Sequence, residues 1–583
     1  MIRRFQVRLL MTLASCVLGI CAQAQAQATP ELMRVDSEPG RIGGRLVVGQ
    51  SPEPKSFNPV FALDQPTQDV LRRMNADLIH INRASGKTEP ALAKSWTASK
   101  DGKSFTVQLR KGIQFSDGAP FDADDVVFSY HVYLDEKLNS PQRGLLLIGD
   151  KPMTVEKLGP YAVRFSFASP YAAAERVFDS IPILPRHLLE KEYAEGKLAQ
   201  AWALSTSAQN WAGLGPFRLK QASPGDRIVL ERNPYYWKID SKGQKLPYLD
   251  ELIFLIVPSR DAQVVRFQAN DTQVIAPLSA ENYAALMPEQ QARHYNLYDA
   301  GPGMEYNFLL FNLNDDTAKL PEVVRRQVWF KGLKFRQAVS MAIDRKAMVR
   351  LVYQNRATPL ATHVTPGKKQ WVNATVQAPE YSVAKARELL KSGGYTWKGD
   401  SLLDTQGKPV EFTILASASN ALRSQMATLI QSDLKALGIN AHVVTMEFRS
   451  MLDRIQNSHD YEAAVMGLSG PDDDPNPDMT FVTSDGPLHL WHLHEKPAPG
   501  SWQAELDHLM AQQLITLDHA KRKKLYDRVQ EIMGRELPVV FLVSPNILGG
   551  AQADLGNLRP AIIDSYLLWN ADEIYWRTPA GNH

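Results

Sequence analysis

The chain has 583 residues, a formal net charge of +2 and two cysteines. Apolar residues make up 44% and charged residues 22%, which is globular composition and excludes a disordered or fibrous chain. Two cysteines exclude a disulfide scaffold, and the near-zero net charge gives no basic surface of the kind that nucleic-acid binding needs.

The first 28 residues have the pattern of an export signal. Arg3, Arg4 and Arg8 precede an apolar run over 9–20, and repeated Ala-x-Ala sites follow as far as Ala28. A basic start, a short apolar run and small residues at the cleavage point are typical of a secretory signal peptide. We therefore expect residues 1–28 to be removed and the mature protein to be periplasmic.

Cleavage at that point would change the composition of the folded chain. It would remove three arginines, no acidic residue and both cysteines, so the formal net charge falls from +2 to −1. A thiol-free chain suits an oxidising compartment. An alternative stays open, because residues 13–16 resemble a lipoprotein cleavage motif that would leave the protein lipid-anchored at Cys16.

Residues 29–44 are polar and rich in glycine and proline, which predicts a linker before order begins near 46–48. Phe105, Val107 and Leu109 alternate with polar residues and predict a half-buried strand. Asp122 then has the character of an N-cap for a helix that runs through Tyr130.

The second half of the chain contains a clear strand–helix–strand unit. Residues 411–415 and 441–446 read as strands, and apolar residues recur at helical spacing over 422–437 between them. Gly438 stands where a glycine commonly ends a helix. A further helix is expected over 384–390. One helix between two strands implies a parallel pair, so the chain is α/β.

Seven segments occur in one order along the chain: 89–96, 101–110, 115–121, 123–126, 213–217, 231–237 and 335–345. In this order, and behind a signal peptide, they resemble the bacterial extracellular solute-binding proteins of family 5, the dipeptide- and oligopeptide-binding group of ABC transporters. The resemblance extends over nearly all of the mature chain. Most of these segments are structural, so they indicate the family and not the ligand.

The resemblance implies an α/β, two-lobed periplasmic binding protein of type II, in the large peptide-binding class, with two hinge strands. Lobe I would comprise 45–301 and 538–583, and lobe II 302–537. The chain would cross between the lobes near 301–303 and return near 538–544. Such lobes close by hinge motion, and a bound solute favours the closed form.

The function implied is that of the extracytoplasmic component of an ABC importer, which captures peptides and delivers them to the transmembrane permease subunits. No catalysis, cofactor, metal or nucleic acid is expected, and we expect a monomer. An oligosaccharide or a nickel chelate is an alternative solute. A secreted hydrolase is a distant alternative, because Gly467-x-Ser469 is followed by Pro471 where a nucleophile motif needs glycine.

The resemblance also points to a candidate site in the loop 467–478, since relatives that take peptides hold the peptide ammonium with an aspartate there. Here the candidates are Asp472 first and Asp474 second. In a closed cleft, a carboxylate holds an ammonium group strongly because the local dielectric is low. Pro471 shifts the spacing, so the sequence leaves open which aspartate faces the cleft.

Further candidate ligand contacts come from both sides of the expected cleft. We expect the turn over 56–59 to enter from lobe I, three residues just past the hinge glycines to touch the ligand, and a tryptophan to stack on it. These candidates are Phe57, Asn58, Met304, Tyr306, Asn307 and Trp491.

Overall fold

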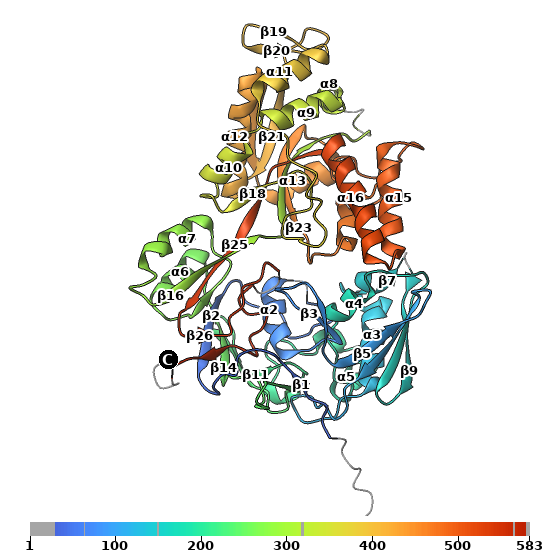
Figure 1. Ribbon diagram of the computed structural model, residues 1–583, viewed down its shortest axis with the longest axis vertical. Helices are drawn as coiled ribbons and strands as arrows, with labels where there is room; N and C mark the ends of the chain where they lie inside the picture. Colours follow the sequence, from blue (N-terminus) through green and yellow to red (C-terminus); the bar gives the residue numbers. More distant parts are fainter. Residues whose placement is uncertain are drawn as a thin grey trace, which may run out of the picture.

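The computed structural model describes residues 29–62, 64–148, 151–315, 317, 320–563 and 566–578. The expected signal peptide and Cys16 lie outside these residues. The chain forms two lobes, one above the other in Figure 1, with the N-terminal half and the C-terminal end in the lower lobe. No helix in the described part of the chain is both long and apolar enough to cross a membrane.

Lobe I contains the largest sheet, in which strands from both ends of the chain lie side by side. The strand order is β11-β12-β14-β2-β15-β25-β16, and β18, from the lobe II part of the chain, pairs with the first residues of β25 at the crossing between the lobes. The bounds are β2 (Arg45–Gln50), β11 (Phe217–Ser223), β12 (Arg227–Arg232), β14 (Glu251–Ile256), β15 (Val274–Ile275), β16 (Tyr295–Pro302), β18 (Ala357–Pro359) and β25 (Val543–Gln552). Helices α6 (Arg260–Gln268) and α7 (Ala280–Leu286) pack near β15 and β25.

A second sheet in lobe I has the order β5-β6-β10-β9. Its strands are β5 (Ala93–Ala98), β6 (Ser104–Leu109), β9 (Thr154–Gly159) and β10 (Ala162–Ser166), and the helices beside it are α3 (Ala123–Leu134), α4 (Ala174–Ser180) and α5 (Arg186–Ala194). The predicted N-cap is present, since the Asp122 side chain accepts from the Asp124 backbone N–H at 2.8 Å. Between the two sheets lie α2 (Gln65–Met74) and the hairpin of β3 (Ile79–Ile81) and β4 (Thr88–Pro90).

Lobe II is built on one mixed sheet of order β22-β21-β23-β17-β24. The strands are β17 (Glu305–Phe311), β21 (Glu411–Ser417), β22 (Asn440–Met446), β23 (Ala463–Ser469) and β24 (Val539–Phe541). The helices are α8 (Pro321–Phe330), α9 (Leu333–Ala342), α10 (Arg345–Leu351), α11 (Val383–Ser392), α12 (Ala421–Leu437), α13 (Phe448–Asp453), α14 (Met479–Val482), α15 (Trp502–Ile515) and α16 (His519–Glu536).

The predicted strand–helix–strand unit is confirmed as β21, α12 and β22, and the two strands pair in parallel. Gly438 ends α12 in the left-handed conformation, with φ of 87°. A Cβ at this position would lie 2.3 Å from the carbonyl oxygen of Asp400. Both the backbone conformation and the close approach therefore require glycine.

The remaining short strands are β1 (Met33–Arg34), β7 (Leu147–Ile148), β8 (Lys151–Pro152), β13 (Lys238–Ile239), β19 (Thr396–Lys398), β20 (Ser401–Leu403), β26 (Leu555–Gly556) and β27 (Tyr575–Trp576). Strand β1 lies within the segment expected to be a linker, and it pairs in parallel with β13. The start of the described chain is thereby attached to lobe I.

Two connections join the lobes. Strand β16 of lobe I ends at Pro302 and β17 of lobe II begins at Glu305, while β24 of lobe II ends at Phe541 and β25 begins at Val543. The hydrophobic clusters divide at the same places: one holds residues between 306 and 543, and the others hold residues before 300 and after 547. Each lobe thus has its own core, and two backbone crossings join the lobes in the part of the chain that the structure describes.

Two buried arginines of the segment 335–345 bind the end of the lobe II chain. Arg336 donates to the backbone carbonyls of Glu536 and Leu537 at 2.9 Å, and Arg345 donates to that of Phe541 at 2.7 Å. Both side chains are about 5% exposed or less. They bind the end of α16 and strand β24 to α9 and α10, and so fix the chain just before it returns to lobe I.

Candidate functional site

A small cavity lies between the two lobes and takes its walls from both. Lobe I contributes the tip of the β3–β4 hairpin, Ala300 of β16 and the segment 560–563, and lobe II contributes Gly367, Lys369, Gln370 and Asp473. Its volume is about 110 Å³. Binding pockets for small molecules usually have a volume of roughly 300–1,000 Å³. This cavity is smaller, so a solute that needs such a pocket can enter only if the lobes move apart.

Beside this cavity, one arginine of lobe I contacts three consecutive aspartates of lobe II. The guanidinium of Arg176 on α4 lies 3.3 Å from Asp472, 2.5 Å from Asp473 and 3.4 Å from Asp474. In Figure 1, α4 lies directly below the ends of α15 and α16. Burial alone would lower the pKa of Arg176, but the three carboxylates outweigh burial and raise it.

Two uncharged contacts reinforce this junction. We call the loop 467–478 the acidic loop. The amide of Asn476 in this loop donates to the hydroxyl of Tyr171 at 2.8 Å, and the backbone N–H of Ala172 donates to the carbonyl of Leu514 at 2.8 Å. The segment 171–176 of lobe I is therefore seated on the acidic loop and on α15 of lobe II.

Asp474 is bound within lobe II. Arg522 on α16 donates to both of its carboxylate oxygens at 2.7 Å, and the Arg522 guanidinium also stacks on Trp371, 5.0 Å from the ring centre. Burial raises the pKa of Asp474, but the charge and hydrogen bonds of Arg522 lower it by more, so the net shift is downward. With both oxygens occupied by a two-pronged arginine pair, Asp474 holds the loop in shape.

Asp472 is in a different electrostatic position. Its Oδ1 accepts from the backbone N–H of Asp474 at 2.8 Å, and its side chain keeps 24% of its surface exposed. Burial, opposed by Arg176, raises the pKa of Asp472 to about 6. Asp472 therefore gains or loses its charge close to neutral pH.

Behind the loop, Asp478 anchors a second charged group of lobe II. Lys368 lies 2.7 Å from its carboxylate, and Tyr526 also donates to it. His363, packed beside Tyr526, has its pKa lowered to about 4 by burial and is neutral at pH 7. These buried contacts hold the acidic loop against the core of lobe II.

The two lobe I residues expected at the ligand lie in the core. Phe57 is fully buried. Asn58 donates to the carbonyls of Leu198 and Ala201 at 2.8 and 3.2 Å, while its Oδ1 accepts from the Val60 N–H at 3.0 Å. The side chain of Asn58 thus stabilises the turn over 56–59, and its contact with a ligand stays a prediction.

The four lobe II candidates are also buried. Tyr306 and Trp491 both pack against Phe481, with ring centres 5.4 and 5.0 Å apart, and Met304 is 4% exposed. Asn307 accepts from Arg423 at 3.0 Å. They support the sheet behind the acidic loop, and their role in ligand binding stays a prediction.

The structure brings forward residues that the sequence did not single out. Asp473 is the middle aspartate of the loop and lines the gap between the lobes, together with Arg83, Lys369 and Gln370. Arg176 comes from a part of the sequence with no distinctive motif. Only the packing of α4 under the loop identifies it, so no spacing rule could have found it.

The model of the bacterial extracellular solute-binding proteins, family 5, matches residues 87–488. The chain belongs to this family. The dipeptide-binding protein of Escherichia coli (strain K12) is 28% identical over 525 residues, which cover 86% of this chain and 89% of that protein. The oligopeptide-binding protein AppA of Bacillus subtilis (strain 168) is 27% identical over 516 residues, which cover 86% and 87%.

The family membership also accounts for the architecture. The structure of Bacillus subtilis AppA in complex with a nonapeptide aligns with a TM-score of 0.67 at 24% identity, covering 93% of this chain and 100% of that one. The two-lobed α/β fold expected from the sequence is confirmed. Family members are solute-binding proteins of extracytoplasmic compartments.

Proposed function

We propose that this protein is the solute-binding component of an ABC importer, and that it captures a peptide of a few residues between its lobes and delivers it unaltered to the permease. The observation that carries the proposal is the acidic loop of lobe II, which lies at a gap walled by both lobes and is closed over by Arg176. Family membership and the peptide-binding relatives support it.

The charges around the gap suit a peptide, which carries an ammonium group at one end and a carboxylate at the other. Asp473 lines the gap, and Asp472 adjoins it with a partly exposed carboxylate. Arg83 and Lys369 provide positive charge across the same space. We propose Asp472 as the ammonium-binding residue, because both oxygens of Asp474 are taken by Arg522.

Capture requires the lobes to move as two bodies. The sequence predicts lobe I as 45–301 and 538–583 and lobe II as 302–537. We propose that the second boundary lies after Phe541 instead, because β24 belongs to the sheet of lobe II, and that the lobes move at the two crossings between them. The separate cores on either side of the crossings support this division. Arg176 would then act as a latch that forms when the lobes approach.

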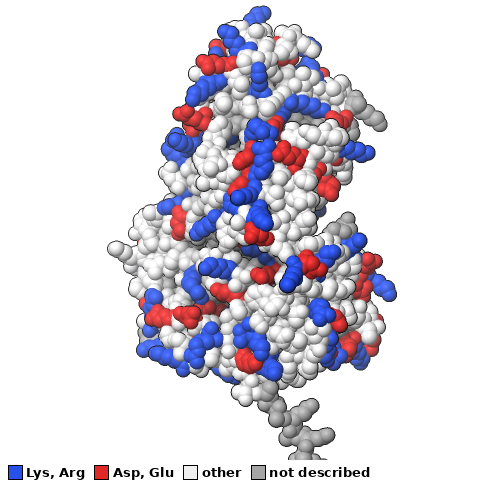
Figure 2. Space-filling view, turned by 45° about the vertical axis from the view of Figure 1, so that its right-hand side comes forward, with Lys and Arg blue, Asp and Glu red and all other residues white. Residues whose placement is uncertain are grey.

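We also propose that the chain is exported through a signal peptide over 1–28, works as a periplasmic monomer and is not an enzyme. The family's extracellular role supports the location. On the face shown in Figure 2, acidic and basic side chains are interspersed over both lobes, without a broad area of one sign.

A thermal-shift screen of the mature protein against peptides, oligosaccharides and nickel chelates tests the solute class. A ligand that binds only the folded state raises the unfolding midpoint, and the shift grows with the logarithm of its concentration above the dissociation constant. We expect short peptides to raise it. Stabilisation by oligosaccharides or nickel chelates, with none by peptides, would replace the peptide in this proposal.

A further inference from the structure

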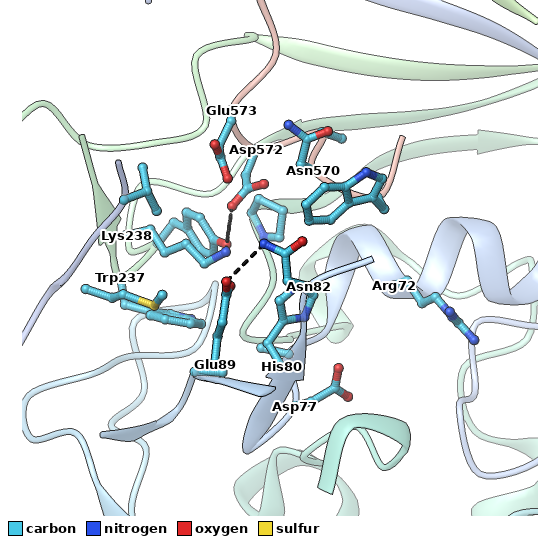
Figure 3. A pocket seen from close by; sticks show the side chains of 18 of the residues that line it. Arg72, Asp77, His80, Asn82, Glu89, Trp237, Lys238, Asn570, Asp572 and Glu573 are labelled. Atoms are coloured by element: carbon cyan, nitrogen blue, oxygen red, sulfur yellow. Dashed lines mark hydrogen bonds and ion pairs between the residues drawn. The ribbon is translucent and has the colours of Figure 1, made fainter. Parts of the chain in front are cut away.

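A second and larger cavity lies wholly within lobe I. It has a volume of about 340 Å³ and is enclosed by α2, the β3–β4 hairpin, strands β1 and β13 and the C-terminal segment 569–573. Figure 3 shows charged and amide side chains from these separate segments pointing into one space. The size falls within the range of small-molecule pockets.

Most charges in this cavity have partners. Lys238 lies 3.0 Å from Asp572, and Arg559 pairs with Glu573. Figure 3 also marks the hydrogen bond from Asn82 to Glu89, which is 2.9 Å long. Within each of the two ion pairs the charges cancel, and the hydrogen bond from Asn82 satisfies the carboxylate of Glu89 without changing its charge.

Arg73, in the last turn of α2, is the exception. It is 4% exposed and lines the cavity, yet its Nε and Nη2 have no hydrogen-bond acceptor among the residues that the structure describes. Asp69 and Asp572 act on it through space only, and Asp572 is paired with Lys238. A buried guanidinium without an acceptor is costly, because the group loses its hydration and gains no bond in return.

Arg73 nevertheless stays charged at neutral pH. Burial lowers its pKa to about 10, so the protonated form still predominates. Two amide oxygens of the same wall, Oδ1 of Asn75 and Oδ1 of Asn570, are also buried without a donor in the described part of the chain. The cavity therefore offers one cationic group and two neutral acceptors that no protein group uses.

A cation is a poorer occupant. The carboxylates of Asp77 and Asp179 and the imidazole of His80 come within 4.8 Å of one another at the edge of this space. However, Arg83 already lies 2.6 Å from Asp179, and burial and the charge of Asp179 raise the pKa of Asp77 well above its usual range. Burial lowers the pKa of His80 to about 3. The arginine occupies the carboxylate that a metal ion would need.

We propose that the lobe I cavity is a binding site for a small anionic solute, whose carboxylate or phosphate group pairs with Arg73 and whose hydroxyl or amine donors meet Asn75 and Asn570. Arginine binds both anions through charge-assisted hydrogen bonds. The site is separate from the gap between the lobes, although Arg83 contributes to the walls of both.

Calorimetric titration of the full purified protein with citrate and, separately, with inorganic phosphate tests this site, in a buffer of constant chloride. We expect at least one of the two anions to bind with one-to-one stoichiometry. Arg73→Met should weaken that binding at least tenfold while leaving peptide affinity unchanged. Arg164→Met is the matched control, because Arg164 is an exposed residue on β10 whose ion-pair partner is Glu156.

A second variant keeps the proposal testable if Arg73→Met does not fold. Asn570→Asp preserves the side-chain shape and adds a negative charge to the same wall, so it should also abolish anion binding. The proposal is overturned if neither anion binds the wild-type protein at millimolar concentration. It is equally overturned if wild type, Arg73→Met and Asn570→Asp bind the anion alike.

Discussion

The guanidinium of Arg176 in lobe I lies 2.5 Å from the carboxylate of Asp473 in lobe II, although the two residues are almost 300 positions apart in the chain. The same guanidinium contacts both neighbouring aspartates. Because this side chain contacts three carboxylates of the opposite lobe, electrostatic attraction stabilises the arrangement in which the two lobes are in contact.

Replacement of Arg176 by methionine tests its role as a latch. The closed arrangement would then bury Asp473 with no positive partner from lobe I, so closure becomes less favourable. We expect the radius of gyration from small-angle scattering to increase and peptide affinity to fall at least tenfold, about 1.4 kcal/mol. Arg164→Met, at an exposed position on β10 paired with Glu156, should change neither quantity. An Arg176→Met protein with wild-type compactness and affinity would contradict the latch.

Asp472→Asn tests the proposed ammonium contact. The change should weaken binding of a peptide with a free N-terminus at least tenfold, about 1.4 kcal/mol, because a charge-assisted bond is lost. An N-acetylated peptide should bind the wild type and the variant equally weakly. The exposed Asp485→Asn is the control in the same lobe. If Asp472→Asn binds the free peptide normally and Asp473→Asn does not, the contact belongs to Asp473.

The affinity for a free peptide should also depend on pH. The pKa of Asp472 is raised to about 6, and only its ionised form can hold an ammonium group. Affinity should therefore be highest just above pH 6 and fall as pH decreases through that value, where the peptide ammonium, with a pKa of about 8, stays protonated. Titration calorimetry at several pH values should show this loss in the wild type. The same slope in Asp472→Asn would assign it to another group.

Asp474→Asn should reduce stability more than binding-site changes do, because it leaves Arg522 buried without its partner. We expect a loss of about 3–5 kcal/mol in urea unfolding. Arg522 holds the pKa of Asp474 below its ordinary value, so the stabilising effect is complete above that ordinary value and is lost as pH falls through the folded-state pKa. The acid limb of the wild-type stability curve should therefore flatten in Asp474→Asn. A loss no larger than that of Asp485→Asn would count against the pair.

Gly407 and Gly438 allow the cost of a left-handed backbone to be compared with the additional cost of a steric clash at Cβ. Gly407 has φ of 78° with nothing near its Cβ position, whereas Gly438 has φ of 87° and the Asp400 carbonyl 2.3 Å away. Gly407→Ala should cost about 1–2 kcal/mol through its left-handed backbone alone. Gly438→Ala should cost clearly more in the same unfolding measurement. Equal losses would show that the end of α12 relaxes away from the clash.

The unit around α12 could be predicted from sequence because its signals are local, whereas the two-lobed fold was implied by the resemblance of seven segments to the family. Strand alternation, the apolar spacing over 422–437 and a glycine at 438 each act within one element. The pairing of β2 with β14 and of β16 with β25 joins residues some 200 positions or more apart, and no local pattern specifies it.

The site was predictable only to the level of its loop. The spacing of the aspartates could not show that Arg522 takes both oxygens of Asp474, because that depends on how α16 packs. Asn58 is expected at the ligand because its turn would enter the cleft, and Trp491 because its ring can stack on a solute; the fold buries both side chains. Arg176 and Arg73 could not be identified from the sequence, because their roles depend on burial beside segments that are distant in the chain.

The central claim is that this protein carries a peptide between its lobes. Mass spectrometry of the solute released from protein purified from its own host, under non-denaturing conditions, tests this most directly. We expect one short peptide per protein molecule, and we expect Arg176→Met to release that peptide more readily than the wild type. An oligosaccharide or a nickel chelate in that position would contradict it.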